Sequence, residues 1–265
     1  LSINIAPHAP YSVTAEALQA SMRLAEELDT TWQIHLSETE EERQNAIKEF
    51  GCSPVEYLAK LGCLNERTIA VHCVALSDRD IGLLAESGAS VVHCPVSNMR
   101  LGCGASPVVK LLKAGINVAL GTDGAASACS LSMFEQMRTA GLIAKGFSQD
   151  PTELTVNQII RMATINGANA LKLHCDVGSL AVGKLADLAV IDMSQLVTMP
   201  VLDVLSNVIY AVEAQCVHQV WVSGSLVANI QQEKLLRPDR GKLLTKSNIM
   251  SWQNRVCEIL RDDFN

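Results

Sequence analysis

The sequence predicts an α/β protein built on a parallel sheet, followed by a smaller β-rich domain. As far as about residue 172, short β-prone runs alternate with longer stretches of helical periodicity, the pattern of strands joined by crossover helices. Around Gly178 this alternation stops, and turns followed by β runs replace it. With 265 residues, 48% of them hydrophobic, the chain is long enough to bury a large core.

The first part of the chain is predicted to hold five βα units in succession. The strands are expected at Ser2–Ile5, Thr31–His35, Thr68–His72, Ala89–His93 and Asn117–Gly121. The helices are expected at Thr14–Leu28, Glu40–Lys60 (broken near Gly51 and Pro54), Asp78–Ser87, Pro107–Ala114, Leu131–Lys145 and Val156–Lys172. Thr14 and Ser77 stand where N-cap residues belong, and Pro107 stands at a first helical position.

The pattern divides the chain into residues 1–175, 176–235 and 236–265. In the middle part, a turn and β run at Gly183–Asp192 precede a hairpin formed by Val217–Val222 and Leu226–Ile230. The last part is expected to be a helical segment, with the helix at Lys242–Asn265.

Composition excludes several classes of partner. A net charge of -7 and a pI near 5.4 give no general attraction to nucleic acid or to an anionic membrane. No run of 18 or more apolar residues occurs, so no membrane span is expected. The nine cysteines are odd in number and form no Cys-x-x-Cys pair, which favours reduced core thiols in a cytoplasmic protein.

Polar residues stand where the predicted strands end, namely His35, His72, His93 and Asp123. In a (β/α) barrel the carboxyl ends of the strands build the active site, so this placement predicts a shared site. Alternation puts His72 on the face of Ala70, and Asp123 on the face of Ala119 and Gly121. Small residues would then lie beneath the polar ones at the barrel axis.

Two imidazoles and a carboxylate, from His35, His72 and Asp123, are ligand types that bind zinc with an open position for water. Bound metal lowers the pKa of that water to about 7, and Glu38 could then donate a proton to the group under attack. A lone strand-end histidine is more often structural, and Asp after Gly-Thr is often only a turn residue. Three strand ends with such residues in order make chance much less likely, and from the spacing alone the metal site and the structural role both stay open.

Two further residues adjoin strand-end histidines. Cys73 and Cys94 would point away from the barrel axis by alternation, so they are expected to be core thiols rather than ligands. The identity of the metal stays open, because imidazole and carboxylate also suit iron and manganese.

The same residues carry a family resemblance. The chain resembles the amidohydrolase superfamily, in the branch that holds methylthioadenosine/S-adenosylhomocysteine deaminases and triazine hydrolases. The resemblance covers residues 1 to about 232 and rests on Pro7–Tyr11, His35–Thr39, Val71–Cys73, His93–Asn98, Gly121–Ser127, Gly178–Leu180 and Gly183–Asp187. It implies a (β/α)8 TIM-type metal-dependent hydrolase barrel, of which about five βα units are present, with a small β-sandwich domain.

The resemblance also implies roles for four residues. His35 would be a metal ligand, and Asp123 a ligand that moves a proton from water to the leaving ammonia. His72 would bind or orient the hydrolytic water, and Glu38 would protonate the ring nitrogen beside the attacked carbon. The implied cofactor is one divalent metal ion, Zn²⁺ in the first place and Fe²⁺ or Mn²⁺ otherwise, with no organic cofactor.

The substrate implied by the resemblance is a small purine-type molecule. His8 would contact the ribose or its 5′ substituent, while His93 and Ser127 would line the pocket. The reaction would be a hydrolytic deamination of an adenosine-type nucleoside. A homodimer agrees with the family, and no nucleic acid or membrane is expected as a partner.

One departure from the family pattern is clear. The family uses a His-x-His pair at the end of the first barrel strand, and no His-x-His occurs in this sequence. With five strands where the barrel needs eight, about three βα units and part of the sandwich are expected to lie outside these residues. A guanine or other nucleobase deaminase, a triazine hydrolase and a non-catalytic scaffold stay as alternatives.

Overall fold

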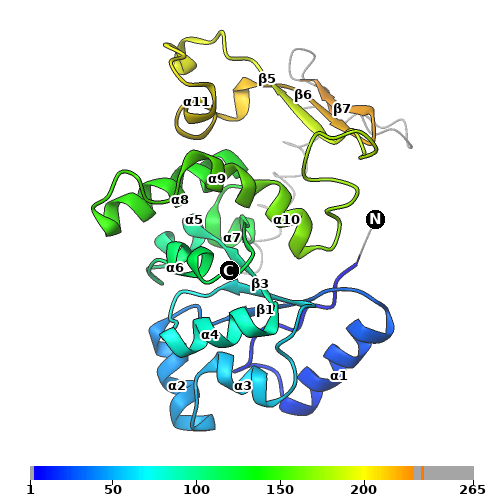
Figure 1. Ribbon diagram of the computed structural model, residues 1–265, viewed down its shortest axis with the longest axis vertical. Helices are drawn as coiled ribbons and strands as arrows, with labels where there is room; N and C mark the ends of the chain where they lie inside the picture. Colours follow the sequence, from blue (N-terminus) through cyan, green and yellow to red (C-terminus); the bar gives the residue numbers. More distant parts are fainter. Residues whose placement is uncertain (1–2, 230–233, 236–265) are drawn as a thin grey trace, which may run out of the picture. The chain divides into compact units, whose positions relative to one another are not determined.

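The computed structural model describes residues 3–229 and 234–235. These residues form two compact units, the first comprising residues 3–179 with 203–210 and the second comprising residues 180–202 with 211–229 and 234–235. Figure 1 labels the helices and strands of both, and each unit is described by itself. The helix expected at Lys242–Asn265 lies outside the described residues.

A parallel sheet of four strands forms the centre of the first unit, which confirms the predicted sheet. Its strands lie in the order β1 (Trp32–Leu36), β2 (Thr68–His72), β3 (Ser90–His93) and β4 (Val118–Leu120). The fifth strand, expected at Ser2–Ile5, is represented in the described residues by one parallel bridge between Ile5 and Trp32.

Eleven helices occur in the described part of the first unit. They are α1 (Ala15–Glu27), α2 (Glu40–Phe50), α3 (Pro54–Lys60), α4 (Asp78–Ser87), α5 (Pro95–Arg100), α6 (Val108–Lys113), α7 (Ala125–Ala128), α8 (Met133–Ser148), α9 (Val156–Ala163), α10 (Ile165–Ala170) and α11 (Val204–Tyr210). Figure 1 shows α1 to α4 gathered beside the strands. In the part of the chain that is described, no helix is both long and apolar enough to cross a membrane.

Local sequence explains most helix ends. The break expected near Gly51 and Pro54 is confirmed, because Gly51 caps α2 in the left-handed conformation and Pro54 opens α3. The N-cap positions of Thr14 and Ser77 are confirmed too, since each side chain accepts a backbone hydrogen bond. Pro107 is an N-cap and not the first helical residue.

Five helices differ from the prediction. The helix expected at Val156–Lys172 is interrupted at Thr164, whose φ of -131° and ψ of -97° separate α9 from α10. Helices α5, α7 and α11 were not predicted, because each is at most seven residues long and shows little periodicity. Helix α11 packs on α8 and α9, where a Cβ at Gly141 would lie 2.8 Å from the Tyr210 hydroxyl.

The two faces of the sheet have different neighbours. Trp32, Ile34 and Leu36 of β1 are buried in one cluster with side chains of the surrounding helices. In the parallel register Ile34 pairs with Ala70, which is buried in the same cluster, so the helix-covered face continues across β2 as far as Ala70. The opposite face of β1 carries Gln33 and His35, which are half-buried. This second face leads to the candidate site.

The second unit contains one antiparallel sheet in its described residues. It consists of β5 (Leu188–Ile191), β6 (Val217–Val222), β7 (Ser225–Asn229) and β8 (Lys234–Leu235) in that order. The predicted hairpin is confirmed, because Ser223 and Gly224 both take positive φ between β6 and β7. A sandwich needs a second sheet, so this part of the fold stays a prediction.

The cysteines agree with the prediction only in part. Those described are free, and Cys73 and Cys94 are buried as expected. Cys129 and Cys175 are exposed, so the prediction that the cysteines are core thiols is wrong for these two.

A buried carboxylate, that of Asp80 in α4, joins α4 to the start of α3. Asp80 is fully buried and accepts hydrogen bonds from the Ser53 hydroxyl, the Ser77 amide at 2.8 Å and the Ser77 hydroxyl at 2.7 Å. We expect Asp80→Ala to lower the free energy of unfolding by about 3 kcal/mol, because it leaves buried donors without an acceptor. Denaturant-induced unfolding measures this change.

The matched control is Asp78→Ala in the same helical turn. The Asp78 side chain is 91% exposed and pairs with exposed Lys110 at 3.2 Å, so its loss should cost less than about 0.5 kcal/mol. Equal losses from both variants would contradict the structural role given to Asp80.

Candidate active site

Three imidazole rings stand in a row at the carboxyl ends of the first strands. The rings of His8 and His35 have centroids 5.1 Å apart, and His35 stacks on His72 at 5.3 Å with an interplanar angle of 22°. His72 is buried, His35 is half-buried and His8 is exposed. The structure therefore brings together three of the histidines that the sequence singled out, with increasing access to solvent along the row.

Hydrogen bonds fix which nitrogen of two rings carries the proton. His35 Nδ1 lies 2.7 Å from the carbonyl oxygen of His8, and His72 Nδ1 lies 2.8 Å from Oδ1 of Asn98. Because both partners are acceptors, each Nδ1 donates its proton, and Nε2 is the ring nitrogen that is left to face the site. Metal-binding histidines have this arrangement, with the second nitrogen donating to an oxygen.

The backbone of His72 departs from strand geometry, which corrects one expectation. Ala70 lies in the helix-covered core, on the face of Ile34, and is not beneath a ring at the barrel axis. His72 and Cys73 take left-handed φ values of 75° and 49°, and this ends the alternation of side chains. The His72 ring consequently stacks on His35 and does not follow Ala70 into the core.

Glu38 lies in the loop after β1, beside His72. Its Oε1 is 3.8 Å from His72 Nε2 and accepts a hydrogen bond from the Cys103 thiol at 3.5 Å. The side chain is 23% exposed, so a substrate has access to the carboxyl group. The Glu38 carboxyl group and the His72 imidazole thus face each other, and the role of Glu38 as a general acid stays a prediction.

Asp123 follows β4 and is held by two donors. Its Oδ2 accepts from the Ser97 hydroxyl and its Oδ1 from the Gly124 amide, both at 2.6 Å. Burial alone would raise the pKa of Asp123, but these hydrogen bonds and the charges of His72 and His35 hold the pKa below its ordinary value. Asp123 is therefore an ionised carboxylate that interacts electrostatically with His72 and His35.

The small residue beneath Asp123 is required by packing. A Cβ at Gly121 would lie 2.7 Å from Val92 and 3.2 Å from the Cys94 sulfur, so a side chain does not fit there. The expected placement of Asp123 above a small residue agrees with this crowding. Cys94 lies close to Gly121, which corrects the expectation that it points away from this face.

Ser127 lies in α7, which follows the Asp123 loop. The guanidinium of Arg100 in α5 donates to the carbonyl oxygens of Ala126 and Ser127, at 3.0 and 2.6 Å. The Ser97 hydroxyl links α5 to Asp123 as well. Helix α5 therefore fixes the segment that carries both Asp123 and Ser127.

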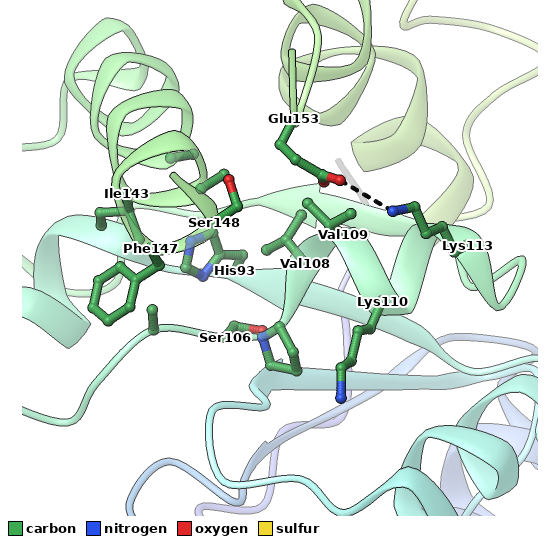
Figure 2. A pocket seen from close by; sticks show the side chains of 14 residues that line it. His93, Ser106, Val108, Val109, Lys110, Lys113, Ile143, Phe147, Ser148 and Glu153 are labelled. Atoms are coloured by element: carbon green, nitrogen blue, oxygen red, sulfur yellow. Dashed lines mark hydrogen bonds and ion pairs between the residues drawn. The ribbon is translucent and has the colours of Figure 1, made fainter. Parts of the chain in front are cut away.

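His93 lies elsewhere, at a cavity between α6 and α8. In β3 it pairs with Leu120 and shares a face with Val91 in the helix-covered core. Figure 2 shows its ring directed into a cavity of about 380 Å³ whose other walls include Val108, Ile143 and Phe147. Sequence reasoning placed His93 in the substrate pocket, whereas alternation from Val91 turns it toward the helices.

The His93 ring is neutral in the folded protein. Burial, followed by the neighbouring charge of His72, lowers the pKa of His93 to about 3. Its Nδ1 is buried without a hydrogen-bond partner. These properties belong to a core histidine that resists protonation.

The candidate ligands do not form a complete metal site by themselves. Among the described residues, no group of three or more His, Cys, Asp or Glu side chains has the geometry to hold an ion. The Nε2 atoms of His35 and His72, whose Nδ1 atoms are already hydrogen-bonded, and the carboxylate of Asp123 nevertheless fit a divalent cation in donor type. These three side chains would therefore supply only some of the ligands that a metal ion needs.

Four residues around the site had no predicted role. Ser97 and Asn98 hold Asp123 and His72, Cys103 contacts Glu38, and Glu42 binds the backbone before α2. The stretch Cys94–Asn98 follows a strand end that was singled out, but helix α5 was not expected to begin there. Three-dimensional contact, not spacing, identifies these four side chains.

The low pKa of His93 predicts a pH dependence of stability. Below its ordinary value of 6.5 the unfolded chain binds a proton at His93 that the folded chain does not bind. The stabilisation from the neutral ring is complete above pH 6.5 and is lost as the pH falls toward 3. Between pH 7 and pH 5 this loss amounts to about 2 kcal/mol.

The measurement compares wild type with His93→Gln. We expect the free energy of unfolding of the wild type to fall by about 2 kcal/mol more than that of the variant between pH 7 and pH 5. The same pH dependence in both proteins would show that His93 is not the group responsible.

The sequence is similar to curated enzymes that act on nucleosides. The 5-methylthioadenosine/S-adenosylhomocysteine deaminase of Teredinibacter turnerae is 44% identical over 256 residues, which cover 97% of this chain and 57% of the relative. The chain thus spans a little over half the length of the curated relatives that it matches.

Two solved structures are similar in fold. An adenosine deaminase from Xanthomonas campestris with bound zinc has a TM-score of 0.87 and 40% identity, covering 96% of this chain and 57% of that one. An atrazine chlorohydrolase from Arthrobacter aurescens complexed with zinc has a TM-score of 0.79 and 25% identity, covering 84% and 49%. The model of the amidohydrolase family matches residues 1–227, and the chain belongs to that family.

Proposed function

We propose that the protein is a metal-dependent hydrolytic deaminase that releases ammonia from an adenosine-type purine nucleoside. The candidate substrates are 5′-methylthioadenosine, S-adenosylhomocysteine and adenosine. The observation that carries the proposal is the placement of the Glu38 carboxyl 3.8 Å from Nε2 of His72, whose ring stacks on His35. A carboxyl group and two imidazoles meet at the ends of the neighbouring strands β1 and β2.

The relatives support the substrate class. The Teredinibacter turnerae relative is named a deaminase of methylthioadenosine and S-adenosylhomocysteine, and the Xanthomonas campestris structure is an adenosine deaminase. Because this chain spans only part of their length, the activity of the whole protein is inferred from them. The triazine hydrolase likeness, at 25% identity, makes a chloro- or aminotriazine the second candidate.

His35 and Asp123 would hold the metal, with His72 as a further ligand or as the group that orients water. When bound, the divalent ion supplies a Lewis acid that lowers the pKa of a water molecule to about 7. We propose zinc as this ion, on the strength of the zinc in the adenosine deaminase neighbour. The second proton carrier is Asp123, which is ionised and therefore able to accept a proton.

The protein side chains move the protons of the reaction. Glu38 donates a proton to the ring nitrogen beside the carbon that is attacked, and His72 Nε2 accepts a hydrogen bond from the attacking water. Asp123 takes one proton from that water and passes it to the amino group, which leaves as ammonia, while the proton of the added hydroxyl group returns to Glu38 as the carbonyl forms. Water is added and ammonia is lost, so no oxidant or organic cofactor enters the balance.

Two residues at the edge of this group would bind the rest of the substrate. His8 is exposed, stands next to His35 and is fixed by the Ser12 hydroxyl 2.6 Å from its Nδ1. Ser127 lies on the segment after Asp123. We propose that His8 contacts the ribose or its 5′ substituent and that Ser127 lines the pocket. The partner is then a small molecule, and we propose a cytoplasmic homodimer.

A screen for ammonia release tests the proposal in the protein at its natural length. The substrates are adenosine, methylthioadenosine, S-adenosylhomocysteine, guanine and aminotriazines, with metal content measured on the same sample. Release from an adenosine-type substrate supports the proposal. Release only from guanine or a triazine would replace the substrate class, and absence of both metal and activity would favour a scaffold.

Glu38→Gln tests the proton donor. The change keeps the size of the side chain and removes the titratable proton, so we expect kcat to fall by about 10²-fold or more with the metal content unchanged. Glu41→Gln, which alters an exposed side chain three residues later, is the control and should keep the wild-type rate. Unchanged turnover in Glu38→Gln would remove Glu38 from the mechanism.

A further inference from the structure

We infer that Glu42 is a positioning residue whose carboxylate holds the Ser37–Glu38 backbone and thereby sets the Glu38 carboxyl against His72. The inference rests on the proposed function of Glu38 and concerns a different side chain. Glu42 does not touch the reacting atoms in this scheme. It acts through the segment that carries the proton donor.

The contacts of Glu42 are made with two consecutive amides. Its Oε1 accepts from the Ser37 amide at 2.9 Å and its Oε2 accepts from the Glu38 amide at 2.6 Å. Ser37 takes a left-handed φ of 50°, a conformation in which successive amides form a concave site for an anion. Both oxygens of one carboxylate are therefore used to hold one turn.

The same turn supports the other side of the site. The carbonyl oxygen of Ser37 accepts from the amides of Val74 and Ala75, both at 2.9 Å, and Leu36 accepts from Cys73 at 3.0 Å. These amides follow His72 directly along the chain. A shift of the Ser37 peptide would consequently move the loop behind His72 together with Glu38.

Helix capping is the competing explanation for Glu42. Glu42 is the third residue of α2, and its amide donates to the Thr39 hydroxyl at the N-cap. In a capping box the glutamate bonds the backbone of the N-cap residue itself. Here the two hydrogen bonds reach Glu38 and Ser37, which precede the N-cap, and the backbone of Thr39 is only a weaker partner of the same carboxylate. The contacts therefore serve the loop after β1 as well as the helix end.

Two substitutions of Glu42 give a graded test in the protein at its natural length. Glu42→Gln keeps the length of the side chain but has one acceptor oxygen, and Glu42→Ala has none. We expect kcat for deamination to fall by about 10-fold in the Gln variant and by more in the Ala variant, because small misplacements of a reacting group are costly. KM and metal content should change by less than about twofold.

Two control variants separate positioning from stability. Thr39→Ala removes the N-cap acceptor of α2 and leaves the Ser37 and Glu38 amides with their acceptor, so it should lower the melting temperature while kcat is kept. Glu41→Gln removes the same charge from the adjacent exposed residue and should change neither property. A fall in kcat of the same size in Thr39→Ala, or normal kcat in Glu42→Ala, would overturn the inference.

Hydrogen exchange gives a readout that does not need activity. The amides of Ser37 and Glu38 should exchange slowly in the wild type and at least 10-fold faster in Glu42→Ala, while amides at the centre of α2 keep their rates. If the wild type releases no ammonia from any nucleoside, the proposed function fails while this measurement still decides whether Glu42 holds the loop. Equal exchange of the two amides in wild type and variant would refute the contact itself.

Discussion

The hydrogen bond from the His35 ring to the carbonyl oxygen of His8 is the contact on which the candidate site depends. It joins the segment before α1 to the end of β1, and the His35 amide donates to the same oxygen. One carbonyl thus fixes both the backbone and the ring of His35. Because His72 stacks on that ring, the position of the second imidazole depends on this contact as well.

Left-handed backbone recurs at the ends of β1, β2 and β4, three strands that are followed by candidate residues. Ser37, His72 and Asp123 have φ values of 50°, 75° and 58°, a region that residues other than glycine seldom occupy. Such conformations persist only where surrounding contacts hold them. Glu42 provides these contacts for Ser37, and Gly124 with Ser97 provides them for Asp123. The residues that do no chemistry in the proposed mechanism are therefore needed for its geometry.

Sequence patterns predicted the elements that repeat and missed those that depend on contact. Alternating β and helical runs were enough for the parallel sheet, and Gly51 with Pro54 was enough for the break between α2 and α3. Helix α5 is six residues long and has no periodicity, so Ser97 and Asn98 could not be assigned to the site in advance. Alternation also failed at His72, because a period of two holds only while the strand geometry continues.

His93 in β3 belongs to the packing under the helices and also affects the electrostatics around His72. Its ring is on the helix-covered face, yet the charge of His72 contributes to its low pKa. A charged ring at His93 would lie close to His72, where it would disfavour the binding of a cation. Burial lowers the pKa of His93 to about 3, so the ring is neutral near neutral pH. The apolar packing around His93 therefore keeps a positive charge away from His72. No side chain of that packing reaches the substrate in the proposed mechanism.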